Sequence, residues 1–164
     1  MTDPDFAPNP VDYRVDSIGA ARQGTNPDVL ARMQTGWAVI GSNQHLPGYC
    51  LLIHDGTADH LSDLPRPARL AFMHDLILLG EAVEQACRTT DPAFWRINYE
   101  VLGNSWPHLH AHIHPRYLWE PDHLRTGPIH LYGPTRQSPE HRLGPQNDPL
   151  RAAITKALND LLAT

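Results

Sequence analysis

Residues 105–116 read Ser-Trp-Pro-His-Leu-His-Ala-His-Ile-His-Pro-Arg, and this stretch decides how the rest of the chain is interpreted. From 108 to 114 histidines alternate with apolar residues, which is the period of a half-buried β-strand. A proline stands on either side of the run, where a missing ladder donor costs least. Alternate side chains of a strand share one face, so the pattern predicts a row of four imidazoles, spaced by about 6.6–6.8 Å. The row comprises His108, His110, His112 and His114.

Four imidazoles on one face are poorly suited to packing, because each buried ring nitrogen needs a hydrogen-bond partner. Two functional interpretations are open. The row is a metal site, since neutral imidazole is the commonest zinc ligand, or it holds a nucleophilic imidazole that attacks phosphorus. The preceding loop, Gly103-Asn104-Ser105, favours the second interpretation. It offers amide, carboxamide and hydroxyl groups to a phosphate and adds no negative charge.

Length and composition exclude several classes of protein. The 164 residues fit one domain with a proper core, and the longest apolar runs, 76–79 and 49–53, are far shorter than the ~20 residues of a membrane span. A formal charge of −5, from 13 Lys and Arg against 18 Asp and Glu, argues against binding to a nucleic-acid backbone.

The N-terminal residues lack the pattern of a signal peptide, so a cytoplasmic location is expected. Cys50 and Cys87 have no metal-site spacing and are predicted to be buried thiols.

Apolar periodicity and turn signals divide the chain into predicted elements. Strands are expected over 37–40, 49–53 and 94–101, in addition to the histidine strand. Helices are expected over about 70–88 and from Asp148-Pro149 onward, and 29–33 is expected to form one or two helical turns. The order strand, strand, helix, strand, strand predicts an α+β fold, with one long helix and a C-terminal helix on an antiparallel sheet.

The same signals predict three parts of the chain. Residues 1–12 are polar and Pro-rich and are expected to be a flexible arm. Residues 13–117 are expected to form the α+β domain, and 118–164 a Pro-rich arm and a C-terminal helix packed on it. The arm has no sustained period, so it is either a long loop or an ordered segment over the core or over a partner subunit.

With the loop included, residues 103–116 resemble the signature of the histidine triad (HIT) superfamily, His-φ-His-φ-His-φ-φ, in which φ is apolar. Residues 37–53, which contain Leu46-Pro47-Gly48, resemble the family's nucleotide-pocket hairpin, and the resemblance extends over about 29–117. It implies a HIT-like fold, commonly a homodimer, that transfers a nucleotidyl group through a covalent nucleoside-phosphoryl-histidine intermediate. It implies neither a catalytic metal nor a cofactor. The expected partner is a small-molecule nucleotide, with no nucleic acid and no membrane.

The resemblance places the nucleophile at His110 and sets His108 and His112, the first and third members of the triad, around the phosphoryl group. It assigns phosphate-binding roles to the loop and, as a weaker match, to a strand residue. Trp37 either stacks on a base or belongs to the core. The expected substrate-binding residues are Asn98, Gly103, Asn104, Ser105, Trp37 and Asn43.

Three positions depart from the family's pattern. His114 stands where the family usually has an apolar residue, so it either joins the site or takes part in a metal site. Tyr49 stands where many members carry a further histidine near the triad. Gly41 stands where they carry a ribose-binding Asp or Asn, a role that Asn43 or Gln44 would have to take.

Two further expectations concern the chain after the triad. Arg116 either approaches a polyphosphate tail or is a solvated cation, and residues 119–121 are expected to cover the pocket mouth. The expected function is a nucleotide hydrolase or nucleotidyltransferase acting on the α-phosphate of a dinucleoside polyphosphate or related nucleotide. The alternatives are a nucleoside phosphoramidase of the same family, a zinc-dependent enzyme that uses the histidine row, and a non-catalytic nucleotide-binding module.

Overall fold

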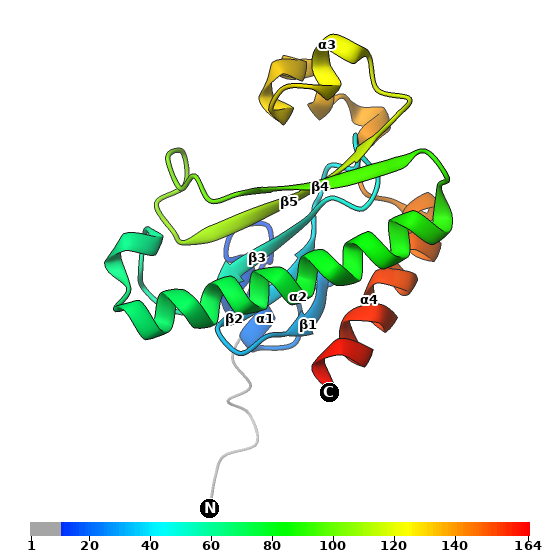
Figure 1. Cartoon of the computed structure of the whole chain (residues 1–164). Helices are drawn as coiled ribbons and strands as arrows, with labels where there is room; N and C mark the ends of the chain where they lie inside the picture. Colours follow the sequence, from blue (N-terminus) through cyan, green and yellow to red (C-terminus); the bar gives the residue numbers. More distant parts are fainter. Residues whose placement is uncertain (1–10) are drawn as a thin grey trace, which may run out of the picture.

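The computed structural model describes residues 11–164, and its centre is a five-stranded antiparallel sheet with the strand order β1-β2-β3-β5-β4 (Figure 1). The strands are β1 (Val29–Arg32), β2 (Gly36–Ile40), β3 (Cys50–His54), β4 (Phe94–Glu100) and β5 (His110–Tyr117). The helices are α1 (Ser17–Arg22), α2 (Arg66–Thr90), α3 (Asp122–Arg125) and α4 (Asp148–Leu162), with short 3₁₀ turns before α2 and between α3 and α4. The predicted α+β architecture is confirmed. Within 11–164, every helix is too short or too polar to cross a bilayer.

The core lies between the sheet and α2, which crosses one face of the sheet (Figure 1). Alternate strand residues point into this layer, where they meet Phe72, Leu76 and Leu79 from the helix. The long helix starts at Arg66, because Pro65 and Pro67 fall where the first backbone N–H groups have no intrahelical acceptor. Helix α4 packs beside α2 through a buried stripe of Leu150, Ile154 and Leu158. Both predicted helices are therefore confirmed, with α2 longer than expected.

The expectation of helical turns over 29–33 is wrong, because most of this segment forms the edge strand β1. Val29 pairs with Val39 and Arg32 with Trp37, while Leu30 and Met33 are buried in the core. A four-residue strand has little local signal of its own. Hydrogen bonding to β2 and burial of its apolar side chains decide its conformation.

The histidine strand starts later and ends later than predicted. Leu109 precedes β5, and the strand continues through Pro115 to Tyr117. Pairing with β3 ends at Ile113, so only β4 lies beside Pro115, opposite Ile97. A proline is tolerated here because one side of the strand has no ladder to lose.

The two cysteines are buried thiols, as predicted. Both are free, and Cys50 and Cys87 belong to the core between β3 and α2. Burial raises the pKa of Cys87 to about 11, so its thiol stays protonated at neutral pH.

The arm after β5 is ordered and is fixed by a buried ion pair. Arg116 is 1% exposed and donates to the Glu120 carboxylate, with 2.8 Å between Nη2 and Oε2. The same guanidinium donates to the carbonyl groups of Leu124 and Gly127 at 2.8 and 2.7 Å. Arg116 is therefore neither a solvated cation nor a phosphate ligand: its hydrogen bonds hold the first turn of the arm to the sheet.

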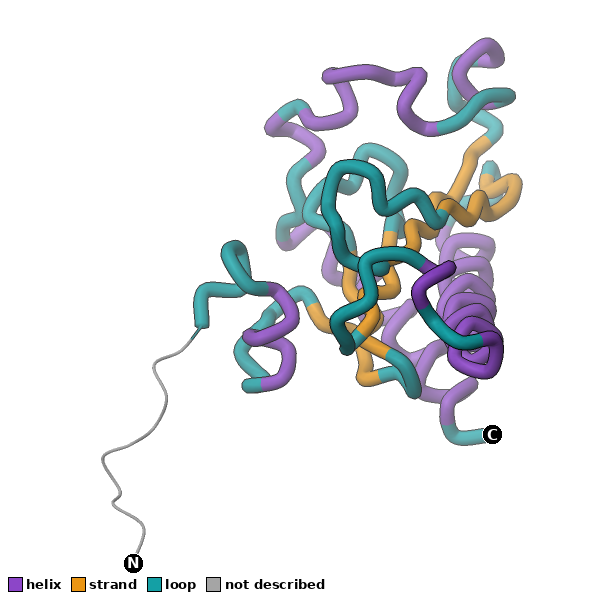
Figure 2. Tube along the Cα trace, turned by 90° about the vertical axis from the view of Figure 1, so that its left-hand side faces the viewer, coloured by secondary structure: helices purple, strands orange, loops and turns teal. Residues whose placement is uncertain are grey.

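The far part of the arm is attached to the loop between β2 and β3. The Asn43 amide donates to the carbonyl of Arg136, and the Gln44 N–H donates to the carbonyl of His141 at 2.6 Å. Figure 2 shows the arm as helical turns joined by loops that run across the top of the molecule. The arm thus covers part of the sheet face opposite α2. The predicted N-terminal arm lies outside the described residues, apart from 11 and 12.

Candidate functional site

Three of the four histidines project from β5 on the face opposite α2. His110 lies across from Ile53, His112 lies between Leu51 and Glu100, and the intervening Ala111 and Ile113 are buried in the core. For these three histidines, the alternation places the rings on one face of the strand, as the sequence predicts. The ring centroids of His110 and His112 are 4.8 Å apart, and those of His112 and His114 are 5.7 Å apart.

His108 stands just before the strand, and its ring has a separate anchor. Its Nε2 lies 2.7 Å from the carbonyl oxygen of His54, which can only accept, so this nitrogen carries the proton. The indole of Trp106 lies 5.0 Å from the rings of both His108 and His110. The tryptophan thus covers this end of the row.

The ring of His110 is held in one tautomer. Its Nδ1 donates to the carbonyl oxygen of His108 at 2.6 Å, which leaves the lone pair on Nε2. The residue is 6% exposed. Nε2 has no hydrogen-bond partner among residues 11–164 and is not one of the fully enclosed unpaired atoms. An imidazole in this state can act as a nucleophile or a base.

His112 is neutral at physiological pH. Burial lowers its pKa to about 4, and the neighbouring His110 and Arg136 add to the effect. Its Nδ1 lies 2.7 Å from the hydroxyl of Tyr49. Burial raises the pKa of Tyr49, so the phenol keeps its proton and can donate a hydrogen bond to His112. With the phenol as donor, Nε2 of His112 carries the proton and can donate to a ligand.

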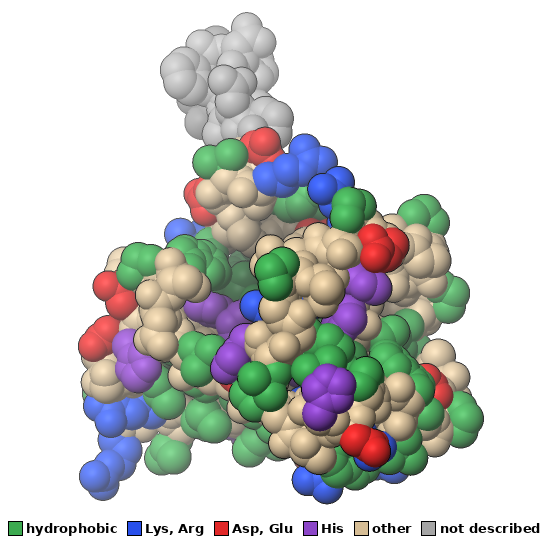
Figure 3. Space-filling model, turned by 90° about the horizontal axis from the view of Figure 1, so that it is seen from above, with side chains coloured by type: hydrophobic (Ala, Val, Ile, Leu, Met, Phe, Trp, Pro, Cys, Tyr) green, Lys and Arg blue, Asp and Glu red, His purple; other side chains and the backbone are tan. Residues whose placement is uncertain are grey.

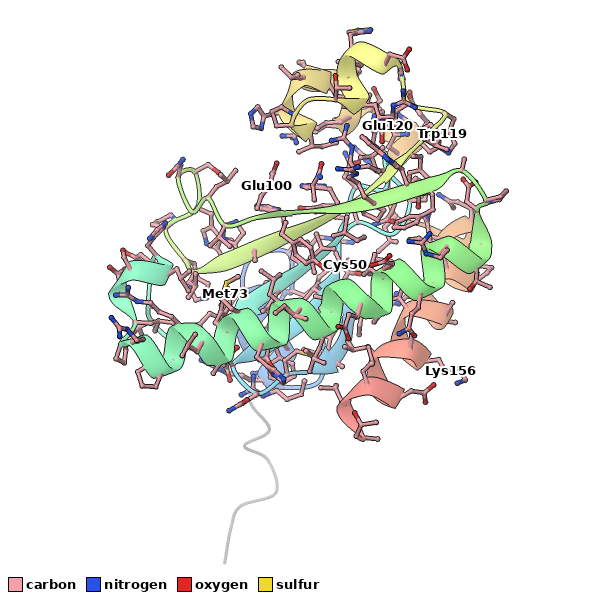
Figure 4. All side chains as sticks on the ribbon, in the orientation of Figure 1. Cys50, Met73, Glu100, Trp119, Glu120 and Lys156 are labelled. Atoms are coloured by element: carbon pink, nitrogen blue, oxygen red, sulfur yellow. The ribbon has the colours of Figure 1, made fainter. Side chains whose placement is uncertain are left out.

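His114 is also neutral and stacks on the same phenol. Its ring centroid lies 4.5 Å from that of Tyr49, and burial lowers its pKa to about 3. Its Nε2 is 3.7 Å from Oε2 of Glu100, at the end of β4. Figure 4 shows Glu100 on the side of the sheet that faces away from α2. His114 thus joins the row.

Gly41 explains how a tyrosine fits beside the row. A Cβ at Gly41 would lie 2.2 Å from Cδ1 of Tyr49, so the ring fills the space that a side chain at 41 would take. The glycine and the tyrosine therefore belong together sterically.

A pocket of about 350 Å³ lies between the histidine row and the arm. Figure 3 shows histidine side chains gathered around a hollow on this face. The pocket brings together three of the predicted site residues, His112, Ser105 and Asn43. Its walls come from the β2–β3 loop, from β4 and the loop after it, from β5 and from the arm: Ser42, Asn43, His45, Leu46, Tyr49, Glu100, Leu102, Ser105, His112, His114, Ile129, His130, Arg136 and Gln137.

The other six predicted site residues do not line this pocket: the triad members His108 and His110, the loop residues Gly103 and Asn104, and the strand residues Asn98 and Trp37. Asn98 has its carboxamide oxygen 2.8 Å from Nη1 of Arg116 and so supports the anchor of the arm. Trp37 shares the histidine face, since it pairs with Ile53, which pairs with His110. The guanidinium of Arg32 covers its indole at 4.8 Å. Neither residue lines the pocket.

The loop before the triad is open to solvent on its polar side. Gly103 has a φ of 67°, a left-handed conformation that favours glycine, and it turns the chain from β4 toward the row. Asn104 and Ser105 are exposed, and within 11–164 their side chains make no hydrogen bond. Their polar groups are available to a ligand.

Residues 119–121 do not cover the pocket mouth. Trp119 stacks on Tyr117 at 4.9 Å and donates to Asp91, and Glu120 faces Arg116 (Figure 4). Residues 129–137 cover the pocket instead, and they carry no sequence signal, because nothing in a Pro-rich segment indicates where it folds back. The described histidines, cysteines and carboxylates do not converge in any group of three that could hold a metal ion.

Comparisons with known proteins agree with this architecture. The family model described as HIT domain matches residues 26–118. A histidine triad protein from Marinobacter aquaeolei superposes with a TM-score of 0.65 at 18% identity, covering 86% of this chain and 95% of that one. A hypothetical histidine triad nucleotide-binding protein from Sulfolobus tokodaii gives 0.64 at 12% identity, with 88% and 91% covered. A zinc-bound histidine triad family protein from Mycobacterium smegmatis gives 0.57 at 18%, with 88% and 93% covered.

No curated protein matches the chain significantly. The structural similarities, at these identities, support the fold. The family match covers more than half of the chain and includes the whole histidine row. The chain belongs to the HIT domain family.

Proposed function

We propose that the chain is a nucleotide hydrolase or nucleotidyltransferase in which Nε2 of His110 attacks the α-phosphorus of its substrate. One observation carries the proposal: the 2.6 Å hydrogen bond from Nδ1 of His110 to the carbonyl of His108, which leaves the Nε2 lone pair free. The bond also fixes the plane of the ring. A nucleophile that is already in its reactive tautomer and orientation needs no rearrangement before attack.

The proposed reaction has two steps, formation and then hydrolysis of a nucleotidyl-histidine intermediate. In the first, the Nε2 lone pair forms a bond to the α-phosphorus, and the bond from phosphorus to the bridging oxygen breaks, so that the leaving group departs with that electron pair. The ring becomes a phosphorylated imidazolium, whose charge is stabilised through Nδ1–H and the carbonyl of His108. In the second, water attacks phosphorus, the P–N bond breaks, the electron pair returns to Nε2, and the water proton is released to solvent.

Neighbouring groups support the attacked phosphate. His112, whose Nδ1 accepts a hydrogen bond from the Tyr49 hydroxyl, offers Nε2–H to a phosphoryl oxygen. Ser105 offers its hydroxyl from the loop. Asn43 lines the pocket, and we assign it to the ribose in place of the missing carboxylate, through the amide N–H that remains after its hydrogen bond to the Arg136 carbonyl. A dinucleoside polyphosphate is the proposed substrate class.

The test is mass spectrometry of the protein briefly mixed with a dinucleoside polyphosphate. We expect a nucleoside monophosphate adduct on His110 and no adduct with His110→Ala, since the attacking atom is gone. His74→Ala, which removes an exposed histidine of α2, is the matched control and should form the adduct normally. Full turnover by His110→Ala would reject the mechanism. Nucleotide binding without any adduct or turnover would favour a non-catalytic binding module, and release of amine from a nucleoside phosphoramidate would favour the phosphoramidase alternative.

A further inference from the structure

One cation in the pocket comes from outside the family's matched segment. The HIT domain match ends at residue 118, and the arm contributes Ile129, His130, Arg136 and Gln137 to the pocket walls. Within residues 11–164, Arg136 is the only Lys or Arg that lines the pocket, and it shares this cavity with His112 and Ser105. The arm therefore adds a charged group to the triad face.

The backbone of Arg136 is fixed, whereas its side chain is uncommitted. Asn43, in the β2–β3 loop, donates a hydrogen bond to its carbonyl group. Within residues 11–164 the guanidinium makes no ion pair and donates no hydrogen bond, in contrast to Arg116, which pairs with Glu120, and Arg125, which pairs with Asp122. A guanidinium that has no protein partner and is carried by a fixed backbone is available to an anionic ligand.

The other titratable groups that line the pocket do not supply a positive charge for an anionic ligand. His112 and His114 are neutral at pH 7, so they donate hydrogen bonds without adding charge. Among the residues that the structure describes, Glu100 is the only carboxylate that lines the pocket, and its Oε2 lies 3.7 Å from Nε2 of His114. An anionic group would be repelled by Glu100 and attracted to Arg136. The guanidinium presents several N–H donors in one plane, a geometry that matches phosphate oxygens.

We propose that the arm forms a phosphate subsite, in which Arg136 binds a phosphate of the substrate other than the one attacked by His110. The proposal rests on the function proposed above and extends it to substrate class: the protein prefers nucleotides with two or more phosphates. The hydrogen bond from Asn43 to the Arg136 carbonyl supports this role. Through it, a residue of the pocket lining holds the backbone of the arginine that is proposed to bind the phosphate.

Equilibrium binding of AMP, ADP and ATP to the full chain tests this without requiring turnover. Wild-type protein should bind ATP about tenfold or more tightly than AMP, since a charge-assisted contact to phosphate contributes at least that factor. Arg136→Gln should lose most of this gain and keep its affinity for AMP. Arg142→Gln removes an exposed arginine of the same arm that does not line the pocket, and it should behave as wild type. Arg136→Lys should retain part of the gain.

The outcomes separate this inference from the proposed reaction. Equal loss of AMP and ATP affinity in Arg136→Gln would overturn the subsite, because Arg136 would then hold the attacked phosphate or the nucleoside. Equal behaviour of Arg136→Gln and Arg142→Gln would overturn it as well. If Arg136→Gln loses only the ATP gain while no adduct forms on His110, the subsite stands and the proposed reaction fails. Thermal unfolding of both variants checks that the arm remains folded.

Discussion

Replacing Glu120 by Gln should destabilise the fold by about 3 kcal/mol, because it leaves Arg116 buried without a compensating charge. The two side chains are 0–1% exposed, and Glu120 also accepts from the Tyr117 N–H at 2.7 Å and the Tyr132 hydroxyl at 2.7 Å. We take the lower end of the range for broken buried pairs, since Arg116 keeps its carbonyl acceptors. For a domain of this size the loss corresponds to a fall of roughly 6–12 °C in the unfolding midpoint.

The effect of Glu120 should depend on pH with a defined sign. Burial alone would raise the pKa of Glu120, but hydrogen bonds from Arg116, the Tyr117 N–H and Tyr132 outweigh it and hold the pKa below the ordinary value of 4.5. A carboxyl whose pKa is lower in the folded state stabilises the fold above the unfolded pKa, and this contribution is lost as the pH falls. The difference between wild type and Glu120→Gln should therefore be full above pH 4.5 and shrink below it.

Thermal or urea unfolding at pH 7 and at pH 3.5–4 measures both effects. Asp122→Asn is the control, since Asp122 pairs with Arg125 on the same arm but is 88% exposed, and it should change stability by about 0.5 kcal/mol or less. A Glu120→Gln midpoint within about 2 °C of both wild type and Asp122→Asn would refute the argument that burial of this pair fixes the arm.

Three further substitutions test the histidine face. Tyr49→Phe removes the hydroxyl that lies 2.7 Å from Nδ1 of His112 but keeps the ring. The free energy of unfolding should fall by about 1–3 kcal/mol, and kcat should fall as well. An unchanged kcat would show that the phenol does not set the tautomer of His112. His114→Leu should make the free energy of unfolding fall less steeply in acid. The pKa of His114 is about 3 in the folded state and 6.5 in the unfolded chain, so protonation favours unfolding as the pH falls. Relative to wild type, the free energy of unfolding of the variant in urea should rise by about 1 kcal/mol per pH unit from 6.5 to 4, and parallel curves would contradict this. Gly41→Ala places a Cβ 2.2 Å from the Tyr49 ring and should cost about 1–3 kcal/mol, most of it recovered with Tyr49→Ala; additive costs would exclude the steric coupling.

The parts of the fold that could be predicted are those with a local signal. The alternation over 108–114 identified the face of the sheet that carries the rings, and the 3.6-residue period identified α2. The segment 29–33 could not be predicted, since its strand conformation depends on pairing with β2. Membership of the HIT domain family also followed from a contiguous stretch of sequence. The cytoplasmic location, the homodimer and the division of the chain at 12 and 117 stay predictions.

The candidate site was predictable in part. The sequence indicated the row of histidines, and the assignment of His110 as the nucleophile stays a prediction. The departures at Tyr49 and Gly41 were visible as two separate anomalies. Their steric connection and the hydrogen bond to His112 required the register of β2 and β3. The roles of Arg116 and Arg136 were out of reach, because a sequence gives the charge of an arginine but neither its burial nor its partner.

The amino-acid sequence by itself determined the strand period, the chemistry of the row and the polar loop before it, because these properties involve neighbours within a few residues. Only the tertiary structure decided which imidazoles are neutral, which nitrogen each ring exposes, and which cation enters the pocket. These properties depend on burial and on contacts between positions such as 49 and 112 or 43 and 136, which are brought together when the sheet closes and the arm folds back over it.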